Sequence, residues 1–181
     1  RRGPTGGLTP MILRERLLAA GGLEGLFLSD HRSKKDLAGI VSGERDAAVT
    51  AALAGRRVLL AVGGQMAAAR AMIALDGLAA RLALVPPKLA PEHIARIAHD
   101  SEAEICVADA EGLSPDALPG LPRIDAADAF RAGSETSRET EWALATSGTT
   151  GAPKLVAHTL EGLAGGIITA AAPEPGTVWS A

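Results

Sequence analysis

The chain has 181 residues and a mass of 18.3 kDa, enough for one ordinary domain and too little for two catalytic domains. Hydrophobic residues make up 47% of it and charged residues 22%, a balance typical of a chain that folds around a hydrophobic core. Its 18 basic and 21 acidic side chains leave a net charge of −3 without any block of like charge, which argues against a nucleic-acid or membrane surface. With two Phe, two Trp and no Tyr, a base-stacking platform is also excluded. We therefore expect a small-molecule partner and no nucleic acid.

Targeting and membrane segments are not predicted either. Charged residues at positions 14–16 interrupt the only apolar run near the start, so no secretory leader is expected. The longest uncharged apolar stretch, residues 162–173, is too short and too rich in Gly to span a bilayer. A cytoplasmic protein is the expectation. The single cysteine, Cys106, lies in an apolar run, which predicts a buried thiol without a chemical role.

The first 55 residues predict two helices and a short strand. A helix is expected between Pro10 and Gly21, with a threonine as its N-cap and glycine as its stop. Residues 26–28 have the pattern of a short strand. Ser33, with an acidic residue three positions later, has the spacing of a capping box and predicts a helix start, and residues 47–53 continue as helix.

From residue 57 strands alternate with helices over short links. Three strands are predicted at 57–62, 82–85 and 104–108, with helices at 65–80 and from Pro91 onward between them. This order is typical of parallel strands joined by right-handed crossovers, so the predicted fold class is α/β with a parallel sheet. The turn at Gly63 and Gly64 lacks the third glycine and the acidic partner of a dinucleotide-binding fingerprint, and we expect it to be structural.

The last third of the chain predicts a long surface connection and then two more strands. Residues 114–138 are expected to form that connection, with one short helix near 125–130. Strands at 142–145 and 154–157 flank a loop rich in Gly and Thr, and a helix is expected after residue 159. A further strand begins at 177–179. No repeat or linker divides the sequence, so residues 1–181 are assigned to one domain.

The loop between those two strands has the composition of a phosphate-binding loop. Its residues are Thr146, Ser147, Gly148, Thr149, Thr150, Gly151, Ala152, Pro153 and Lys154. Glycines let amide N–H groups approach an anion, hydroxyls donate to phosphate oxygens, and the lysine adds a positive charge. Each charge-assisted hydrogen bond is worth about 1.5–3 kcal/mol. The loop is not a Walker loop, because proline precedes the lysine and leucine follows it.

The same nine residues resemble the phosphate-binding signature of the adenylate-forming enzymes, the superfamily of acyl-CoA synthetases, peptide-synthetase adenylation domains and luciferases. That signature runs approximately Ser/Thr-Ser-Gly-Thr-Thr-Gly-x-Pro-Lys-Gly, and positions 146–154 fit it without a gap. Upstream, Pro87, Pro91-Glu92 and Asp100-Ser101 resemble a further family segment, so the resemblance covers roughly residues 45–170. Leu155 departs from the signature's glycine, and with Ala145 in place of a common aromatic residue the motif does not give the substrate branch.

The resemblance implies the parallel-sheet N-terminal part of the family's large domain, truncated at its C-terminal end. It implies an ATP-dependent ligase with Mg²⁺ that converts a small carboxylic acid into an acyl-adenylate and then passes it to a thiol, coenzyme A foremost. Lys154 would be the catalytic cation, and Thr146 would also approach the magnesium ion. The cofactor-binding residues would be Thr146, Ser147, Gly148, Thr149, Thr150, Gly151 and Lys154. The family's adenine, ribose and C-terminal lysine contacts cannot be placed here, so the isolated chain is expected to be inactive and to self-associate through exposed apolar surface.

The same residues also bear on other functions. A non-catalytic nucleotide- or phosphate-binding module stays an alternative, although it would need adenine and ribose contacts within this chain. A serine hydrolase using Ser147 and His158 does not fit, because the sequence around the serine is not Gly-x-Ser-x-Gly and no acid is placed to orient the histidine. His93 and His99 are six residues apart on a predicted helix and would not share a face, so a metal pair is not expected.

Overall fold

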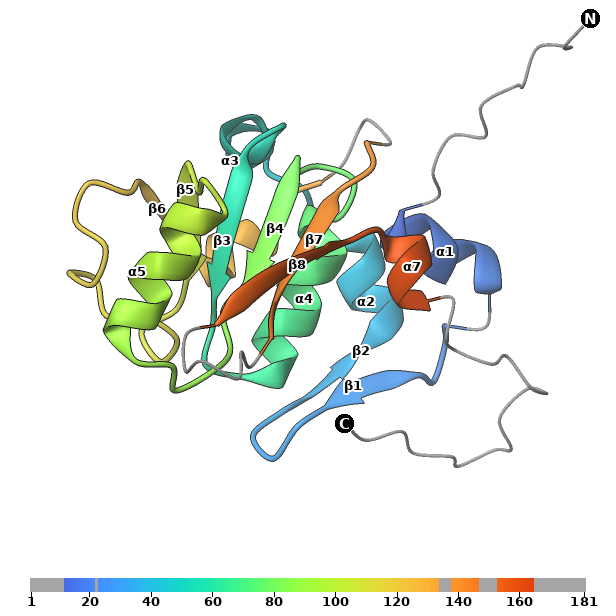
Figure 1. The fold of residues 1–181 in the computed structure, drawn as a ribbon. Coiled ribbons are helices and arrows are strands. Elements are labelled where there is room, and N and C mark those ends of the chain that lie inside the picture. The colour runs from blue at the N-terminus through green and yellow to red at the C-terminus, as the bar shows by residue number, and fades with distance from the viewer. Residues whose placement is uncertain (1–11, 22, 134–137, 147–152, 165–181) are drawn as a thin grey trace, which may run out of the picture.

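The computed structural model describes residues 12–21, 23–133, 138–146 and 153–164 (Figure 1). These residues form a six-stranded sheet in the order β6-β5-β3-β4-β7-β8, together with a separate two-stranded hairpin. The sheet strands are β3 (Arg57–Ala61), β4 (Arg81–Leu84), β5 (Ile105–Ala108), β6 (Arg123–Asp125), β7 (Glu141–Thr146) and β8 (Lys154–His158). All neighbours pair in parallel except β7 and β8, which are antiparallel. The predicted α/β class with a mainly parallel sheet is therefore confirmed.

The central strands are apolar on both sides because helices cover both faces of the sheet. On one face Leu60 of β3 packs in a core cluster with Leu75 of α4 (Gln65–Leu75). On the other face Leu59 packs with Ile97 of α5 (Pro91–Asp100). Cys106 of β5 lies directly opposite Leu59, is 2% exposed and forms no disulfide, so the prediction of a buried thiol is correct.

Short helices complete the fold, and aspartates begin several of them. They are α1 (Leu13–Ala20), α2 (Leu37–Ser42), α3 (Ala47–Leu53), α6 (Ala126–Ala129) and α7 (Leu160–Ala164). The side chains of Asp36, Asp46 and Asp125 accept backbone N–H groups at the starts of α2, α3 and α6. The short helix expected near 125–130 is confirmed. Among the described helices none combines the length and the apolar character that crossing a membrane requires.

The prediction of a helix start at Ser33 is wrong. Asp30 accepts hydrogen bonds from the backbone N–H and the hydroxyl of Ser33, at 2.7 and 3.2 Å, and this turn reverses the chain. The result is the antiparallel hairpin of β1 (Phe27–Ser29) and β2 (Lys34–Asp36), which Figure 1 shows apart from the main sheet. The helix begins only at Leu37, with Asp36 as its N-cap.

Two other boundaries differ from expectation. The helix predicted over 65–80 ends at Leu75, because Asp76 is already extended, with ψ = 131°, and Gly77 then adopts φ = +82°. A Cβ at Gly77 would lie 2.5 Å from Ile12 Cγ2, so a larger residue does not fit there. The predicted connection 114–138 contains strand β6 at its centre. The strand predicted at 177–179 lies outside the described residues.

Candidate functional site

The parallel strands β3, β4, β5 and β7 all end at the same edge of the sheet. From β3 the chain passes through α4 to β4, which pairs with one side of β3. From β4 it returns through α5 to β5, which pairs with the opposite side of β3. Such a reversal creates a crevice outside the carboxyl ends of the strands, where α/β proteins bind their ligands. The described residues place a hairpin and two cavities at this edge.

The hairpin of β7 and β8 carries the two ends of the predicted phosphate-binding loop. Thr146 and Lys154 are paired directly across the two strands, and the Thr146 hydroxyl donates to the Lys154 carbonyl at 3.2 Å. Directly opposite residues of an antiparallel pair project to the same face, so both side chains leave the sheet on one side. Both residues are exposed, and Lys154 forms no ion pair with any described residue.

The remaining predicted site residues cannot be placed. Ser147, Gly148, Thr149, Thr150 and Gly151 lie outside the described residues. The structure therefore brings Thr146 and Lys154 together and leaves the roles of the others as predictions.

An apolar cavity of about 390 Å³ lies on the face from which Thr146 and Lys154 project. Leu144 lines it, and since side chains alternate along a strand, Thr146 projects to the same face two residues later. The other walls are the ends of β3 and β4 with their following turns and the first turn of α4. Gln65 supplies the only side-chain hydrogen-bonding group among the lining residues. A cavity of this size and lining is of the kind that holds a small organic ligand.

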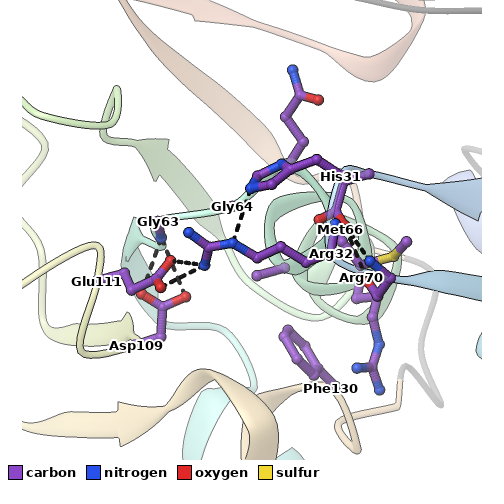
Figure 2. A pocket seen from close by; sticks show the side chains of 13 residues that line it. His31, Arg32, Gly63, Gly64, Met66, Arg70, Asp109, Glu111 and Phe130 are labelled. Carbon is purple, nitrogen blue, oxygen red and sulfur yellow. Dashed lines mark hydrogen bonds and ion pairs between the residues drawn. The ribbon is translucent and has the colours of Figure 1, made fainter.

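A second, polar cavity of about 340 Å³ lies at the crevice between β3 and β5 (Figure 2). Arg32, at the tip of the β1–β2 hairpin, reaches across to both carboxylate oxygens of Glu111, the longer contact being 2.6 Å. The Asp109 carboxylate accepts from the backbone N–H groups of Gly63 and Gly112, at 3.0 and 2.6 Å. The cavity's acidic groups are thus already paired with donors of the protein.

The Gly63-Gly64 turn separates these two cavities and lines both. A Cβ on Gly63 would lie 2.3 Å from Cβ of Glu111, so a larger residue does not fit there. The predicted structural role of Gly63 agrees with this geometry. Asp109 and Glu111 are not among the site residues predicted from the sequence, although an aspartate directly after a buried parallel strand is a signal for this edge.

The histidines do not assemble a site. His99 is exposed and contacts Asp100, while His93 is half-buried on the same helix and His158 half-buried at the end of β8. The described ranges contain no group of three His, Cys, Asp or Glu side chains placed to hold a metal ion.

Comparison with known proteins gives a match in fold and none in sequence. No protein-family model matches the sequence, and no curated protein matches it. O-succinylbenzoate coenzyme A synthetase (MenE) from Bacillus subtilis, in complex with AMP, superposes with a TM-score of 0.54 at 17% identity, over 72% of this chain and 38% of that one. VinN in complex with 3-methylaspartate superposes with a TM-score of 0.58 at 20% identity, over 81% and 46%.

A third similar structure is the N-terminal subdomain of NpsA from Klebsiella oxytoca in complex with 3-hydroxybenzoyl-AMSN. Its TM-score is 0.52 at 16% identity, over 74% of this chain and 36% of that one. All three are adenylate-forming enzymes, and this chain spans less than half the length of each. The chain thus has the fold of the N-terminal domain of adenylate-forming enzymes, as the signature at 146–154 predicted.

Proposed function

We propose that this chain carries the ATP phosphate-binding part of a ligase that activates a carboxylic acid as its acyl-adenylate. The observation that carries the proposal is the β7–β8 pairing, which holds Thr146 and Lys154 opposite each other at the ligand-binding edge of the sheet. The signature residues between them and the likeness in fold to structures that contain AMP or 3-hydroxybenzoyl-AMSN support it. Residues 1–181 would then be the N-terminal portion of such a domain.

Formation of an acyl-adenylate from ATP requires stabilisation of the negative charge on the phosphates. A carboxylate oxygen of the acid attacks the α-phosphorus, the bond from that phosphorus to the bridging oxygen breaks, and pyrophosphate leaves with the electron pair. Lys154, exposed and without a carboxylate partner among the described residues, would neutralise part of the charge on the leaving phosphates. Strand pairing fixes the backbone from which the Lys154 side chain extends, so the lysine is already at this edge of the sheet before the reaction begins.

Thr146 is compatible with a magnesium ion. Its hydroxyl hydrogen is used by the Lys154 carbonyl, which leaves the oxygen lone pairs free to face a cation. Mg²⁺ is commonly bound by one or two protein oxygens together with substrate phosphates, so one hydroxyl suffices from this part of the chain. When bound, the ion would add positive charge at the phosphates.

The small carboxylic acid and the thiol acceptor belong to the proposal as well. The apolar cavity beside Thr146 offers uncharged space for an organic co-substrate. We propose coenzyme A as the acceptor, because acyl-adenylates react readily with thiols and the sequence signature is shared with acyl-CoA synthetases.

The test is exchange of labelled pyrophosphate into ATP with a panel of small carboxylic acids, run together with direct measurement of ATP binding. Both are measured on the complete protein of which residues 1–181 are proposed to be the N-terminal portion, because the isolated chain is expected to be inactive. Lys154→Ala removes one charge-assisted contact of about 1.5–3 kcal/mol and should lower exchange about 10- to 150-fold. Lys35→Ala, the matched loss of an exposed strand lysine, should leave it unchanged. Both variants should unfold at the wild-type urea concentration.

The outcomes separate the candidate functions. An unchanged exchange rate in Lys154→Ala would remove this lysine from the reaction. ATP binding without exchange for any acid would favour the non-catalytic nucleotide-binding module instead.

A further inference from the structure

A small cavity of about 160 Å³ lies between α2, α4 and the end of α6, and no residue of the β7–β8 hairpin lines it. Three arginines line it, namely Arg45, Arg70 and Arg131, beside the ring of Phe130. We propose that this arginine cavity binds a small tetrahedral oxyanion, inorganic phosphate, between the guanidinium groups of Arg45 and Arg70.

Arg70 is the first of the two cations that lack a carboxylate partner. It projects from α4 onto the Phe130 ring, with its Cζ 4.1 Å from the ring centroid, and Figure 2 shows the two side chains together. Among the described residues it forms no ion pair and no hydrogen bond, although it is half-buried. Stacking on an aromatic ring fixes the guanidinium plane and leaves its five N–H donors available. Burial lowers the pKa of the Arg70 guanidinium.

Arg45 is the second cation at this cavity that lacks a carboxylate partner. Its terminal nitrogens donate to the carbonyls of Ala132 and Val41, at 3.0 and 2.8 Å. Its Nε is buried and has no acceptor. Burial and the nearby charge of Arg14 both lower the pKa of Arg45. A half-buried guanidinium that lies near another cation, Arg14, would gain from an anion at its terminal nitrogens.

The other charged groups at the cavity do not supply that anion. Arg131 is already neutralised by Asp128 and Asp46, at 3.0 and 3.4 Å. Glu44 is the only acidic residue among the lining residues, and it is exposed and pairs with neither guanidinium. Arg45 and Arg70 therefore outweigh Glu44, and the lining carries a net positive charge.

Size and geometry select the ligand. At about 160 Å³ the cavity is smaller than the roughly 300–1,000 Å³ of pockets for larger organic ligands, so a single oxyanion is the appropriate occupant. Guanidinium groups that come from two different elements offer donors in two planes. A tetrahedral phosphate can accept from both at once, whereas a planar carboxylate presents two oxygens in one plane.

Phosphate binding is measured by calorimetry at constant ionic strength in a Lys154→Gln background, which removes the proposed ATP phosphate contact. We expect saturable binding of inorganic phosphate there and at least about tenfold weaker binding after Arg70→Gln, the loss of one charge-assisted contact. Arg96→Gln is the matched control, because it removes the same charge from the exposed face of α5, where Arg96 pairs with Asp100. Retained binding in Arg70→Gln, or equal weakening in Arg96→Gln, would overturn the proposal.

A second measurement needs no variant at the cavity. Phosphate should slow phenylglyoxal modification of Arg45 and Arg70, read by peptide mass spectrometry, and leave the modification of Arg96 unchanged. Equal rates with and without phosphate would overturn the site. Acetate and AMP serve as comparison ligands. If either protects Arg70 at lower concentration than phosphate does, the assignment to a free tetrahedral ion is wrong.

Discussion

The carboxylate of Asp76 joins three parts of the fold at one buried point. Asp76 ends helix α4 and is 3% exposed. It accepts the backbone N–H of Leu13 at 2.6 Å, which ties the first turn of α1 to the core. It also accepts Nε1–H of Trp142 at 3.1 Å, which fixes the largest fully buried side chain of the sheet. We therefore expect Asp76→Ala to destabilise the protein although no apolar contact is deleted.

The magnitude follows from the two donors that lose their acceptor. A buried donor left without a partner costs about 1–3 kcal/mol, and the Trp142 indole is fully enclosed. The Leu13 N–H lies in a partly buried contact, so water can replace part of its bond. Removing the carboxylate also recovers the cost of burying it. The free energy of unfolding should accordingly fall by about 1–3 kcal/mol, a large share of the 5–15 kcal/mol of an ordinary domain.

A double-mutant cycle isolates the hydrogen bond from other effects. Asp76→Ala, Trp142→Phe and the double variant are unfolded in urea and followed by far-UV circular dichroism. Side chains that interact directly should show a coupling of about 0.5–3 kcal/mol. Asp116→Ala, an exposed aspartate in a turn, is the control and should unfold as wild type does. If the two single effects add within about 0.5 kcal/mol, or if Asp76→Ala is as harmless as the control, the reasoning is refuted.

The same residue predicts a pH dependence with a definite sign. Burial raises the pKa of Asp76 above its ordinary value of 3.8, against the opposing effect of its hydrogen bonds to Leu13 and Trp142. The folded state then binds the proton more tightly than the unfolded state. The contribution of Asp76 to stability is therefore largest below 3.8 and falls as the pH rises through the raised value. Asp76→Asn cannot titrate. The unfolding free energy of the wild type minus that of this variant should therefore fall as the pH rises over that range. A difference that rises with pH would contradict the direction of the shift.

Two further predictions concern the room for a side chain at Gly112 and the reactivity of the Cys106 thiol. Gly112→Ala places a Cβ 2.2 Å from the carbonyl oxygen of Ala61, so the backbone must shift and about 1–3 kcal/mol of stability should be lost in urea unfolding. Gly64→Ala has open space and an ordinary φ of −127°, and it should cost less than about 1 kcal/mol. An equal loss in both variants would contradict the steric explanation. Burial raises the pKa of the Cys106 thiol to about 11, so a disulfide reagent at pH 8 should label it only at the rate of unfolding, and rapid labelling of folded protein would show that the thiol is accessible.

The central sheet could be predicted from the sequence because its strands are short apolar runs between glycines and polar residues. The run predicted at 57–62 is strand Arg57–Ala61, and the run at 104–108 is strand Ile105–Ala108. Strand β6 escaped prediction because it has one apolar side chain, Ile124, between Arg123 and Asp125. It is an edge strand that hydrogen-bonds only to β5, so its sequence needs no apolar run.

Ser33 shows how a local signal can serve either of two structures. A hydroxyl with an acidic residue three positions later suits a helix start, but the same hydroxyl also suits a turn that an aspartate closes from the other side. Asp30 is placed to close it, and the hairpin forms. Asp30, three positions before Ser33, therefore decides between the turn and the helix start, and the motif that begins at Ser33 does not.

One part of the candidate site could be predicted because its residues are contiguous in the sequence, and another part could not because its residues are far apart. The loop composition at 146–154 is contiguous and could be predicted. The cavities could not, because their walls come from segments far apart in the chain: Arg32 meets Glu111 across 79 positions, and Arg45 meets the Ala132 carbonyl across 87. Only the fold brings such partners together, and no pattern along the sequence marks them.

The antiparallel strand β8 explains why the proposed phosphate site lies at the edge where the parallel strands end. A parallel strand that ends at this edge must send the chain back across the sheet before the next strand can begin. A hairpin avoids that crossover, so both ends of the loop stay at the edge where β3, β4 and β5 also end. The pairing of Thr146 with Lys154 then keeps their Cα atoms roughly 5 Å apart, whatever the residues between them do. The backbone of Lys154 is positioned by the sheet rather than by the loop, and changes at positions 147–152 should alter phosphate contacts without displacing that backbone.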